Sequence, residues 1–196
     1  IDRAKFVGNS GTHLIYVANT DDLPSTVTVR SSLIASNTLT GSVAFLRDAY
    51  IGFLNNTIVD NTLGGAVLDG APGDGLGLFR FKRNIVVQPA AFTLSLGSAV
   101  PPAGRVVDNL SNDATMASYD PSNFNLDPVF AEGYRLSPQS PAVDRALLDD
   151  SPALDLASRP RPVDLTDVAD YQPGTTTDLG AYELQAGAVV FANGFE

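Results

Sequence analysis

Cysteine is absent from the chain, and histidine occurs once, at His13. Without thiols the chain cannot form a disulfide framework, a thiolate metal site or a cysteine nucleophile. A single histidine rules out a histidine-based metal site, and the chain has no nucleophile-elbow sequence whose serine His13 could activate. These absences exclude the commonest nucleophilic and zinc-dependent chemistries.

Basic residues are also scarce. Lysine and arginine total 12 against 22 aspartates and glutamates, which gives a net charge of −10. A negative field of this kind repels phosphate backbones and anionic membrane surfaces, so we expect no nucleic-acid partner. No apolar run approaches the roughly 20 residues that a spanning helix needs, so we expect no membrane span.

The remaining composition is that of a folded β-rich protein. Hydrophobic residues make up 44% of 196 residues, which is enough for a sizeable core and argues against intrinsic disorder. Gly, Ser, Thr and Asn are abundant, as in proteins with many turns. The chain opens on Ile1 within a strand-like pattern, so we expect a mature or trimmed fragment.

A repeat of unequal units runs through residues 1–113. Units of about 20–30 residues that contain only strands predict coils stacked on one another. One column of the repeat holds Asn56, Asn84 and Asn109, preceded by Ala4 and Ser32. A second column holds Asn9, Asn37, Asn61 and Pro89. The aligned stretches are "VTVRSSLIASNT" (27–38), "IGFLNNTIVDNT" (51–62), "LFRFKRNIVVQP" (78–89) and "RVVDNLSND" (105–113).

These columns predict an all-β fold, a right-handed parallel β-helix of about four to five coils. Val29, Phe53, Phe81 and Val106 align as an apolar column that would point inward, while their neighbours alternate outward. Asparagine suits the coil corner because it tolerates left-handed backbone and its amide can bond the next coil. An antiparallel sandwich is the alternative, but the tight hairpin signals that it needs are few.

The repeat fades from Ala114 onward, where proline becomes frequent. Eight of the 13 prolines lie between Pro121 and Pro173, and proline lacks the N–H that a central strand requires. We expect residues 114–185 to form an irregular cap over the last open coil. Residues 186–196 would be a separate tail; its end resembles short Phe-x-x-Gly-Phe-Glu sorting tails of exported Gram-negative proteins, and a frayed last strand is the alternative.

Four motifs in this region resemble the C-terminal signature of choice-of-anchor Q domain proteins: "FNLDPVF" (124–130), "YRLSPQSPAVD" (134–144), "RPRPVD" (159–164) and "DLGAYE" (178–183). The resemblance implies a pectate-lyase-like right-handed parallel β-helix in an exported bacterial protein, extracellular or on the outer cell surface. It implies no reaction.

The motif residues themselves have structural interpretations. We expect Asp144 and Asp178 to accept backbone N–H bonds in turns. Arg159 or Arg161 would pair with a nearby carboxylate, and Tyr182 would pack with its hydroxyl outward.

The candidate ligand-binding residues are basic: Arg30, Arg80, Lys82 and Arg105 map onto two adjacent outward columns. Stacked coils lie about 4.8 Å apart, so these side chains would form a compact cationic strip. Guanidinium groups suit the carboxylates or sulfates of an anionic polysaccharide. The alternative is a solvated face whose charges pair with Asp48, Asp108 or loop carboxylates.

The function that these patterns favour is a noncatalytic exported scaffold for adhesion or glycan contact. A polysaccharide lyase or glycoside hydrolase is the alternative, although the register does not bring Asp60, Asp69 and Asp74 to the spacing of about 6.5–9.5 Å that inverting hydrolysis needs. A purely structural assembly role is a third option.

We expect no cofactor. Calcium is the only metal with candidate ligands, at Asp21 and Asp22, at Asp149 and Asp150, or at Asp74. We also expect self-association through the N-terminal coil, residues 4–19, because its upper edge would be bare.

Overall fold

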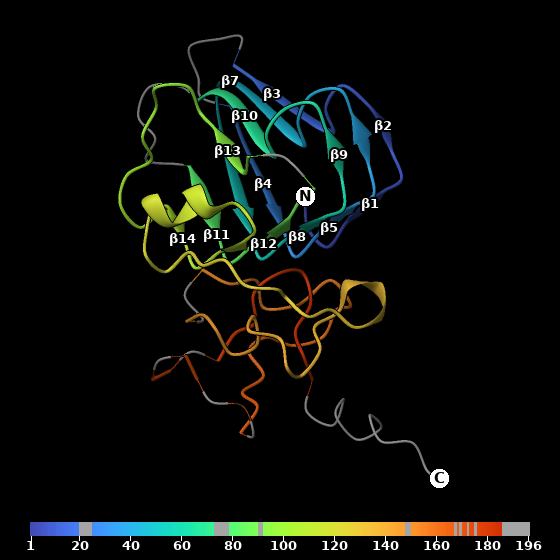
Figure 1. The fold of residues 1–196 in the computed structure, drawn as a ribbon, viewed down its shortest axis with the longest axis vertical. Coiled ribbons are helices and arrows are strands. Elements are labelled where there is room, and N and C mark those ends of the chain that lie inside the picture. Colours follow the sequence, from blue (N-terminus) through green and yellow to red (C-terminus); the bar gives the residue numbers. More distant parts are fainter. Residues whose placement is uncertain are drawn as a thin grey trace.

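The computed structural model of the chain is a parallel β-solenoid of about four turns, followed by an irregular C-terminal segment (Figure 1). The structure describes residues 1–19, 25–72, 79–89, 92–147, 150–166, 168, 170, 171, 173, 174 and 176–185. Helical structure in these residues is limited to two short 3₁₀ turns, η2 (Ala114–Ser118) and η3 (Glu132–Tyr134). The predicted all-β parallel β-helix is therefore confirmed.

Three parallel sheets run along the solenoid. The first sheet has the order β1 (Lys5–Val7), β5 (Leu33–Ala35), β8 (Thr57–Val59), β12 (Ile85–Val87) and β15 (Leu110–Ser111). The second sheet contains β3 (Ile15–Ala18), β4 (Thr26–Arg30), β7 (Ala44–Leu54), β10 (Leu68–Pro72), β11 (Arg80–Lys82), β13 (Leu94–Ser95) and β14 (Val106–Val107). The third sheet comprises β2 (Ser10–Gly11), β6 (Thr38–Leu39) and β9 (Thr62–Leu63).

The vertical register predicted from the repeat is confirmed in the core. Val29 pairs with Phe53, Phe53 with Phe81, and Phe81 with Val106. All four side chains are buried, and the rings of Phe53 and Phe81 lie 5.8 Å apart between centroids. Burial of each such side chain contributes about 1.5–3 kcal/mol relative to exposure. This apolar column is the centre of the solenoid core.

An asparagine ladder runs beside the core at one corner of the coil. The backbone N–H of Asn56 donates to Oδ1 of Asn84 at 3.0 Å, and that of Asn84 donates to Oδ1 of Asn109 at 2.9 Å. Their side-chain amides donate to the same oxygens and also to carbonyls of the preceding coil. Because every ladder asparagine is fully buried, these bonds satisfy polar groups that water cannot reach.

The sharp bend at this corner is made by the residue before the ladder asparagine, not by the asparagine itself. The left-handed residues are Ser31, Asn55, Arg83 and Asp108, with φ between 46° and 57°. The expectation that the ladder asparagines adopt left-handed backbone was therefore wrong. The ladder asparagine contributes its side-chain amide, which reaches and bonds the neighbouring coil. The bend is made by the left-handed φ of the residue before it.

A second ladder follows the next corner and contains Gln88 where the sequence alignment placed Pro89. Oδ1 of Asn61 accepts the N–H of Asn37 at 3.0 Å, and Oε1 of Gln88 accepts the N–H of Asn61 at 2.9 Å. Oδ1 of Asn112 then accepts the N–H of Gln88 at 3.1 Å. The one-residue difference has a physical reason, because proline offers the ladder neither an N–H nor an amide oxygen on its side chain.

Residues 114–124 close the end of the solenoid. Met116 of η2 is 1% exposed and packs against the core. Asn123 adds another step to the ladder, since its Oδ1 accepts the N–H of Asn109 at 3.0 Å. Phe124 forms a parallel bridge with Leu110. This short stretch lies where the cap was expected.

Residues 125–185, which we call the C-terminal segment, instead cover a flank of the solenoid. The segment lies along the outer face of the first sheet (Figure 1). Ile85 and Leu110 of that sheet pack into a second hydrophobic cluster with Leu136, Ala142, Val143, Ala146, Leu165, Leu179 and Leu184. Most of the segment thus packs along the solenoid rather than over its last coil, because the first sheet carries apolar residues on both faces and both need burial.

Candidate functional site

The basic strip lies on the outer face of the second sheet. Leu54 pairs with Arg30 on one side and with Lys82 on the other, so Arg30 and Lys82 occupy one column with Leu54 between them. Arg80 pairs with Gly52, and the carbonyl of Arg105 accepts the N–H of Phe81 at 2.8 Å. Arg80, Lys82 and Arg105 therefore come together on adjacent rungs, whereas Arg30 lies two rungs from Lys82, about 9.6 Å away along the solenoid.

Among the described residues, Asp150 and Asp2 pair with this strip; the sequence suggests loop carboxylates as partners without naming these two. Oδ2 of Asp150 lies 3.7 Å from Nη1 of Arg80 and 3.5 Å from Nζ of Lys82. Oδ1 of Asp2 lies 3.4 Å from Nε of Arg30. Such partly exposed pairs contribute about 0–1 kcal/mol each. Arg105 forms no ion pair with a described carboxylate, so the cluster of three cations keeps a positive excess.

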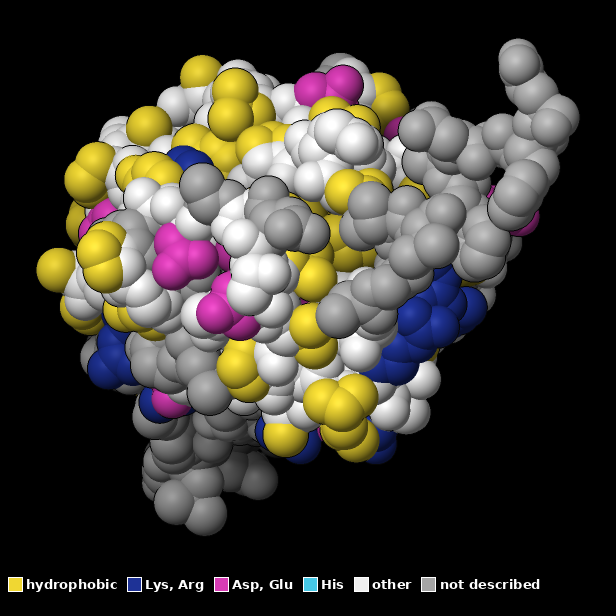
Figure 2. All heavy atoms as spheres, turned by 90° about the horizontal axis from the view of Figure 1, so that it is seen from below, with side chains coloured by type: hydrophobic (Ala, Val, Ile, Leu, Met, Phe, Trp, Pro, Cys, Tyr) yellow, Lys and Arg dark blue, Asp and Glu magenta, His cyan; other side chains and the backbone are white. Residues whose placement is uncertain are grey.

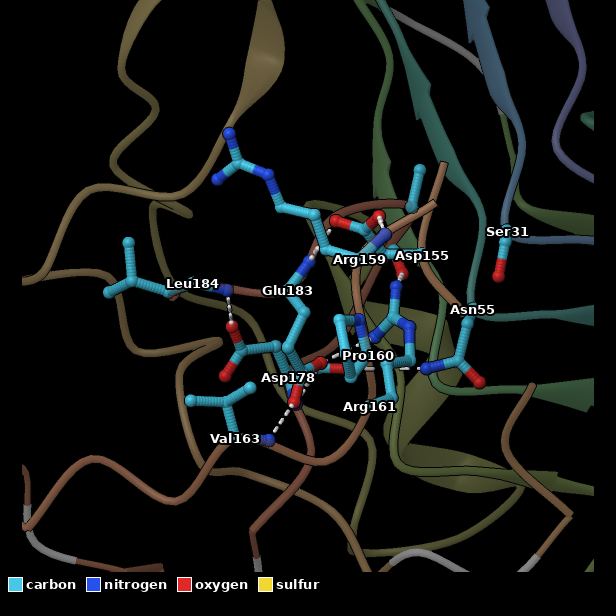
Figure 3. Close-up of polar contacts among 12 residues, drawn as sticks. Ser31, Asn55, Asp155, Arg159, Pro160, Arg161, Val163, Asp178, Glu183 and Leu184 are labelled. Carbon is cyan, nitrogen blue, oxygen red and sulfur yellow. Dashed lines mark hydrogen bonds and ion pairs between the residues drawn. The ribbon is translucent and has the colours of Figure 1, made fainter. Parts of the chain in front are cut away.

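The C-terminal motifs converge on one buried arginine. Nη1 of Arg161 donates to Oε2 of Glu183 at 2.8 Å and to the carbonyl of Asp178 at 3.0 Å. Nη2 donates to the carbonyl of Gly180 at 2.7 Å, and Figure 3 shows Arg161 beside Asp178 and Glu183. Arg161 therefore joins the motif at 159–164 to the motif at 178–183.

The carboxylates around Arg161 are held by backbone N–H groups. Oδ1 of Asp178 accepts the N–H of Asp144 at 2.9 Å, and Oδ2 of Asp144 accepts the N–H of Leu165 at 3.2 Å. Glu183 Oε1 accepts the N–H of Val163 at 2.9 Å. We call Asp144, Arg161, Asp178 and Glu183 the Arg161 network.

Burial raises the pKa values of the acids in the Arg161 network. Loss of hydration raises the pKa of Asp144 to about 6 and that of Asp178 to about 7. The pKa of Glu183 rises to about 8, chiefly through loss of hydration and also through the charge of Asp178, while Arg161 acts in the opposite direction. Loss of hydration lowers the pKa of Arg161.

The Arg161 network attaches the C-terminal segment to the first sheet. Nδ2 of Asn55 donates to the carbonyl of Asp178 at 3.2 Å, and the N–H of Ala181 donates to Oγ1 of Thr57 at 2.9 Å. The N–H of Gly180 donates to the carbonyl of Arg83 at 2.8 Å. Because the network side chains are buried, they are placed for structural support rather than for contact with a substrate.

Tyr182, the remaining motif residue, packs at the edge of this network. Its ring is 5% exposed and lies under the guanidinium of Arg135, whose Cζ is 4.6 Å from the ring centroid. The sequence did not single out Arg135. No local pattern marks Arg135, because its partner ring, that of Tyr182, lies 47 residues further along the chain.

Of the acidic residues considered for catalysis, Asp60 and Asp69 have different hydrogen-bond partners, and Asp74 lies outside the described residues. Asp60 accepts the hydroxyl of Tyr134 at 2.9 Å, whereas Asp69 accepts its neighbour Gly70 N–H at 2.7 Å. The described residues contain no group of three or more His, Asp or Glu side chains suited to a metal ion. Four of the residues considered for calcium, Asp21, Asp22, Asp74 and Asp149, lie outside the described residues, as does the tail at 186–196.

His13 packs against neighbouring coils. Its Nδ1 accepts the N–H of Ser42 at 3.1 Å, and its ring centroid lies 5.0 Å from that of Phe45. This contact leaves Nδ1 occupied and gives His13 a packing role on the outer face of the second sheet.

A surface pocket of about 400 Å³ opens near the end of the solenoid, and the sequence did not predict it. Phe92, at 66% exposure, is an exposed aromatic residue in its lining. The other described residues that line it are Gln88, Pro89, Asn112, Asp113, Ala114 and Thr115.

No family model, curated protein or solved structure matches the chain. The described residues include no helix with the length and apolarity needed to cross a membrane. The basic strip and the C-terminal motifs are therefore the starting points for a functional assignment.

Proposed function

We propose that this protein is a noncatalytic β-solenoid scaffold that binds an anionic polysaccharide along the outer face of its second sheet. The observation that carries the proposal is the placement of Arg80, Lys82 and Arg105 on adjacent rungs. Arg80 and Lys82 share one rung and Arg105 lies on the next, about 4.8 Å away, so a polymer with repeated carboxylates or sulfates can contact several at once.

The charge distribution supports this assignment. The chain carries a net charge of −10, which repels an anionic polymer over most of the surface. Binding would therefore concentrate where cations exceed carboxylates. Asp150 is the one described carboxylate paired with Arg80 and Lys82, and its side chain is 44% exposed, so it can move aside when a ligand carboxylate takes its place.

A polysaccharide lyase or glycoside hydrolase is the alternative. Such an enzyme needs an acid or base beside the sugar that it cleaves. Asp150 is near the basic strip, but the described residues place no second carboxylate beside Arg80 or Lys82. The acids with raised pKa values belong to the Arg161 network, where they are buried within the C-terminal segment and accept backbone N–H bonds. These placements support the scaffold over the enzyme.

The proposal is tested by measuring the affinity of polygalacturonate and of a sulfated oligosaccharide for the Arg80→Ala, Arg105→Ala double variant. We expect at least a tenfold loss, because each charge-assisted hydrogen bond contributes about 1.5–3 kcal/mol. Arg47→Ala removes an exposed arginine of the same sheet outside the strip and should bind like the wild type. Unchanged affinity in the double variant would reject the strip. Release of shortened sugar chains in the same samples would favour the enzyme.

We also propose that the C-terminal segment is of the choice-of-anchor Q type, and that the protein is exported to the bacterial surface or the extracellular space. The support is the packing of the resembling motifs around Arg161 into one unit. Fractionation of the source cells tests this localisation. Protein found only in the cytoplasm would contradict it.

Self-association through the N-terminal coil is a further proposal. Strands β1, β2 and β3 each pair with one neighbour in the described residues, so their other edges carry backbone groups able to pair with another strand. Sedimentation at several concentrations tests it. A species of constant monomer mass would reject it.

A further inference from the structure

A second hollow of about 190 Å³ lies on the C-terminal segment. Its buried lining includes Leu136, Tyr182 and Leu184, whereas Arg135 and Arg159 are exposed. Ala131, Pro138, Glu183 and Gln185 complete the lining. We call this hollow the arginine cleft. It shares no residue with the basic strip, so a ligand bound in the cleft would be independent of the proposed glycan contact on the strip.

Arg135 is held in place by the ring beneath it. Its Cζ lies 4.6 Å from the centroid of Tyr182, and that ring is buried. Stacking on an aromatic face occupies the plane of a guanidinium and leaves the N–H groups at its edges available. Those edge groups are the ones that bind a carboxylate with two parallel hydrogen bonds.

Arg159 reaches the same cleft from a different motif. Its backbone is fixed by Asp155, whose Oδ1 accepts the Arg159 N–H at 2.8 Å and whose own N–H donates to the Arg159 carbonyl at 2.9 Å. The side chain extends away from the buried carboxylates, whereas Arg161 points into them (Figure 3). Of the two motif arginines, Arg161 is therefore structural and Arg159 is available to a ligand.

The acid that lines the cleft does not neutralise these arginines. Glu183 lines the cleft, but its carboxylate is 0% exposed and is paired with Arg161. Neither Arg135 nor Arg159 forms an ion pair with a described carboxylate. Figure 2 shows Lys and Arg side chains gathered at one margin of the face that the C-terminal segment forms. In this segment the exposed arginines are Arg135 and Arg159, because Arg161 is buried and Arg145 is half-buried against the rings of Phe124 and Tyr171.

We propose that the arginine cleft binds one carboxylate carried on a body no larger than a single ring. The two guanidinium groups would receive the carboxylate, and Leu136 and Leu184 would contact the body of the ligand. The volume sets the size limit, because it is below the roughly 300–1,000 Å³ of pockets for drug-sized ligands. Oε1 of Gln185 can accept a hydroxyl, because the bonds of this side chain in the structure use Nε2.

The test is an NMR titration of the isotope-labelled full chain with benzoate, galacturonate and inorganic phosphate, each at millimolar concentration. We expect saturable shifts of the Gln185 side-chain amide with at least one carboxylate, and weaker shifts with phosphate. Arg135→Gln and Arg159→Gln should each weaken carboxylate binding at least fivefold, and the double variant should abolish it. Tighter binding of benzoate would identify an apolar acid as the ligand class, and tighter binding of galacturonate would identify a uronate.

Arg47→Gln is the matched control, because Arg47 is exposed on β7 and outside the cleft. It should bind both carboxylates like the wild type. Three results would overturn the proposal: no saturable shift, phosphate binding as tight as that of either carboxylate, or equal losses in Arg47→Gln and Arg159→Gln. Circular dichroism of each variant confirms that a loss of binding is not a loss of fold, and Arg159→Gln removes no side-chain bond that the structure contains.

Discussion

Arg161 and Glu183 form an ion pair of 2.8 Å in which both side chains are 0% exposed. Removing two charges from water is costly, and their attraction offsets that cost only when the remaining donors and acceptors are also bonded. Here the carbonyls of Asp178 and Gly180 accept two further guanidinium bonds, and the N–H of Val163 donates to the second carboxylate oxygen, so among these groups Nε of Arg161 is the donor left without a partner in the described residues. The pair therefore joins two stretches, 159–164 and 178–183, of an irregular segment that has almost no secondary structure to hold it.

Removal of Arg161 should be strongly destabilising. Arg161→Ala leaves Glu183 buried without its partner, and we expect a loss of about 3–5 kcal/mol in the free energy of unfolding. Arg159→Ala, two residues away and exposed, should change it by less than about 0.5 kcal/mol. Urea denaturation measures both. Equal small losses would show that the buried pair does not hold the segment.

Stability should fall as pH rises. The pKa values of Asp144, Asp178 and Glu183 in the fold, about 6, 7 and 8, lie above their ordinary values of 3.8, 3.8 and 4.5. The folded state therefore holds more protons than the unfolded state, so the stability from these groups is greatest below about pH 4 and declines until about pH 9, above the highest of the three pKa values.

The pH dependence is measured as the urea midpoint between pH 4 and pH 9. Asp144→Asn is the matched variant, because an amide oxygen can still accept the N–H of Leu165 and the amide cannot ionise. It should flatten the part of the decline near pH 6. A midpoint that rises with pH over this range would contradict the assignment.

The ladder asparagines should tolerate serine better than alanine. Asn84→Ala leaves the backbone N–H of Asn56 without its acceptor, and each unsatisfied buried group costs about 1–3 kcal/mol. Ser32 already fills a ladder position in the second coil, where its Oγ accepts the N–H of Ala4 in the first coil at 3.1 Å. Asn84→Ser should therefore lose less stability. Amide hydrogen exchange at Asn56 measures the difference, and equal exchange in both variants would reject it.

Gly180 should not accept a side chain. Its φ is 84°, and an added Cβ would lie 2.7 Å from Cδ1 of Ile85 and 2.7 Å from Oγ1 of Thr57. We expect Gly180→Ala to cost about 2–5 kcal/mol, from the left-handed backbone and the overpacking together. Gly133 has φ 68° but open space around it, so Gly133→Ala isolates the backbone contribution of about 1–2 kcal/mol. Thermal unfolding compares the two, and equal losses would show that the close packing is unimportant.

Parts of this structure can be predicted from local sequence because the solenoid repeats. Phe53 and Phe81 pair in the register that their alignment predicts, and Asn56, Asn84 and Asn109 stack as their column predicts. Each rung lies over the one before it, so the chemical character of a column is visible in the spacing alone. The same logic located the outward positions of Arg80 and Lys82 on the second sheet.

The amino-acid sequence by itself determined the coil, its core column and its asparagine corners, because a parallel stack needs like residues at repeated positions. Tertiary structure alone decided that the C-terminal segment covers the flank of the first sheet, that Asp150 meets Arg80, and that Arg161 points inward while Arg159 points outward. The physical reason is that the segment has no period. Its position depends on contacts such as that between Asn55 and Asp178, which are 123 residues apart in the chain.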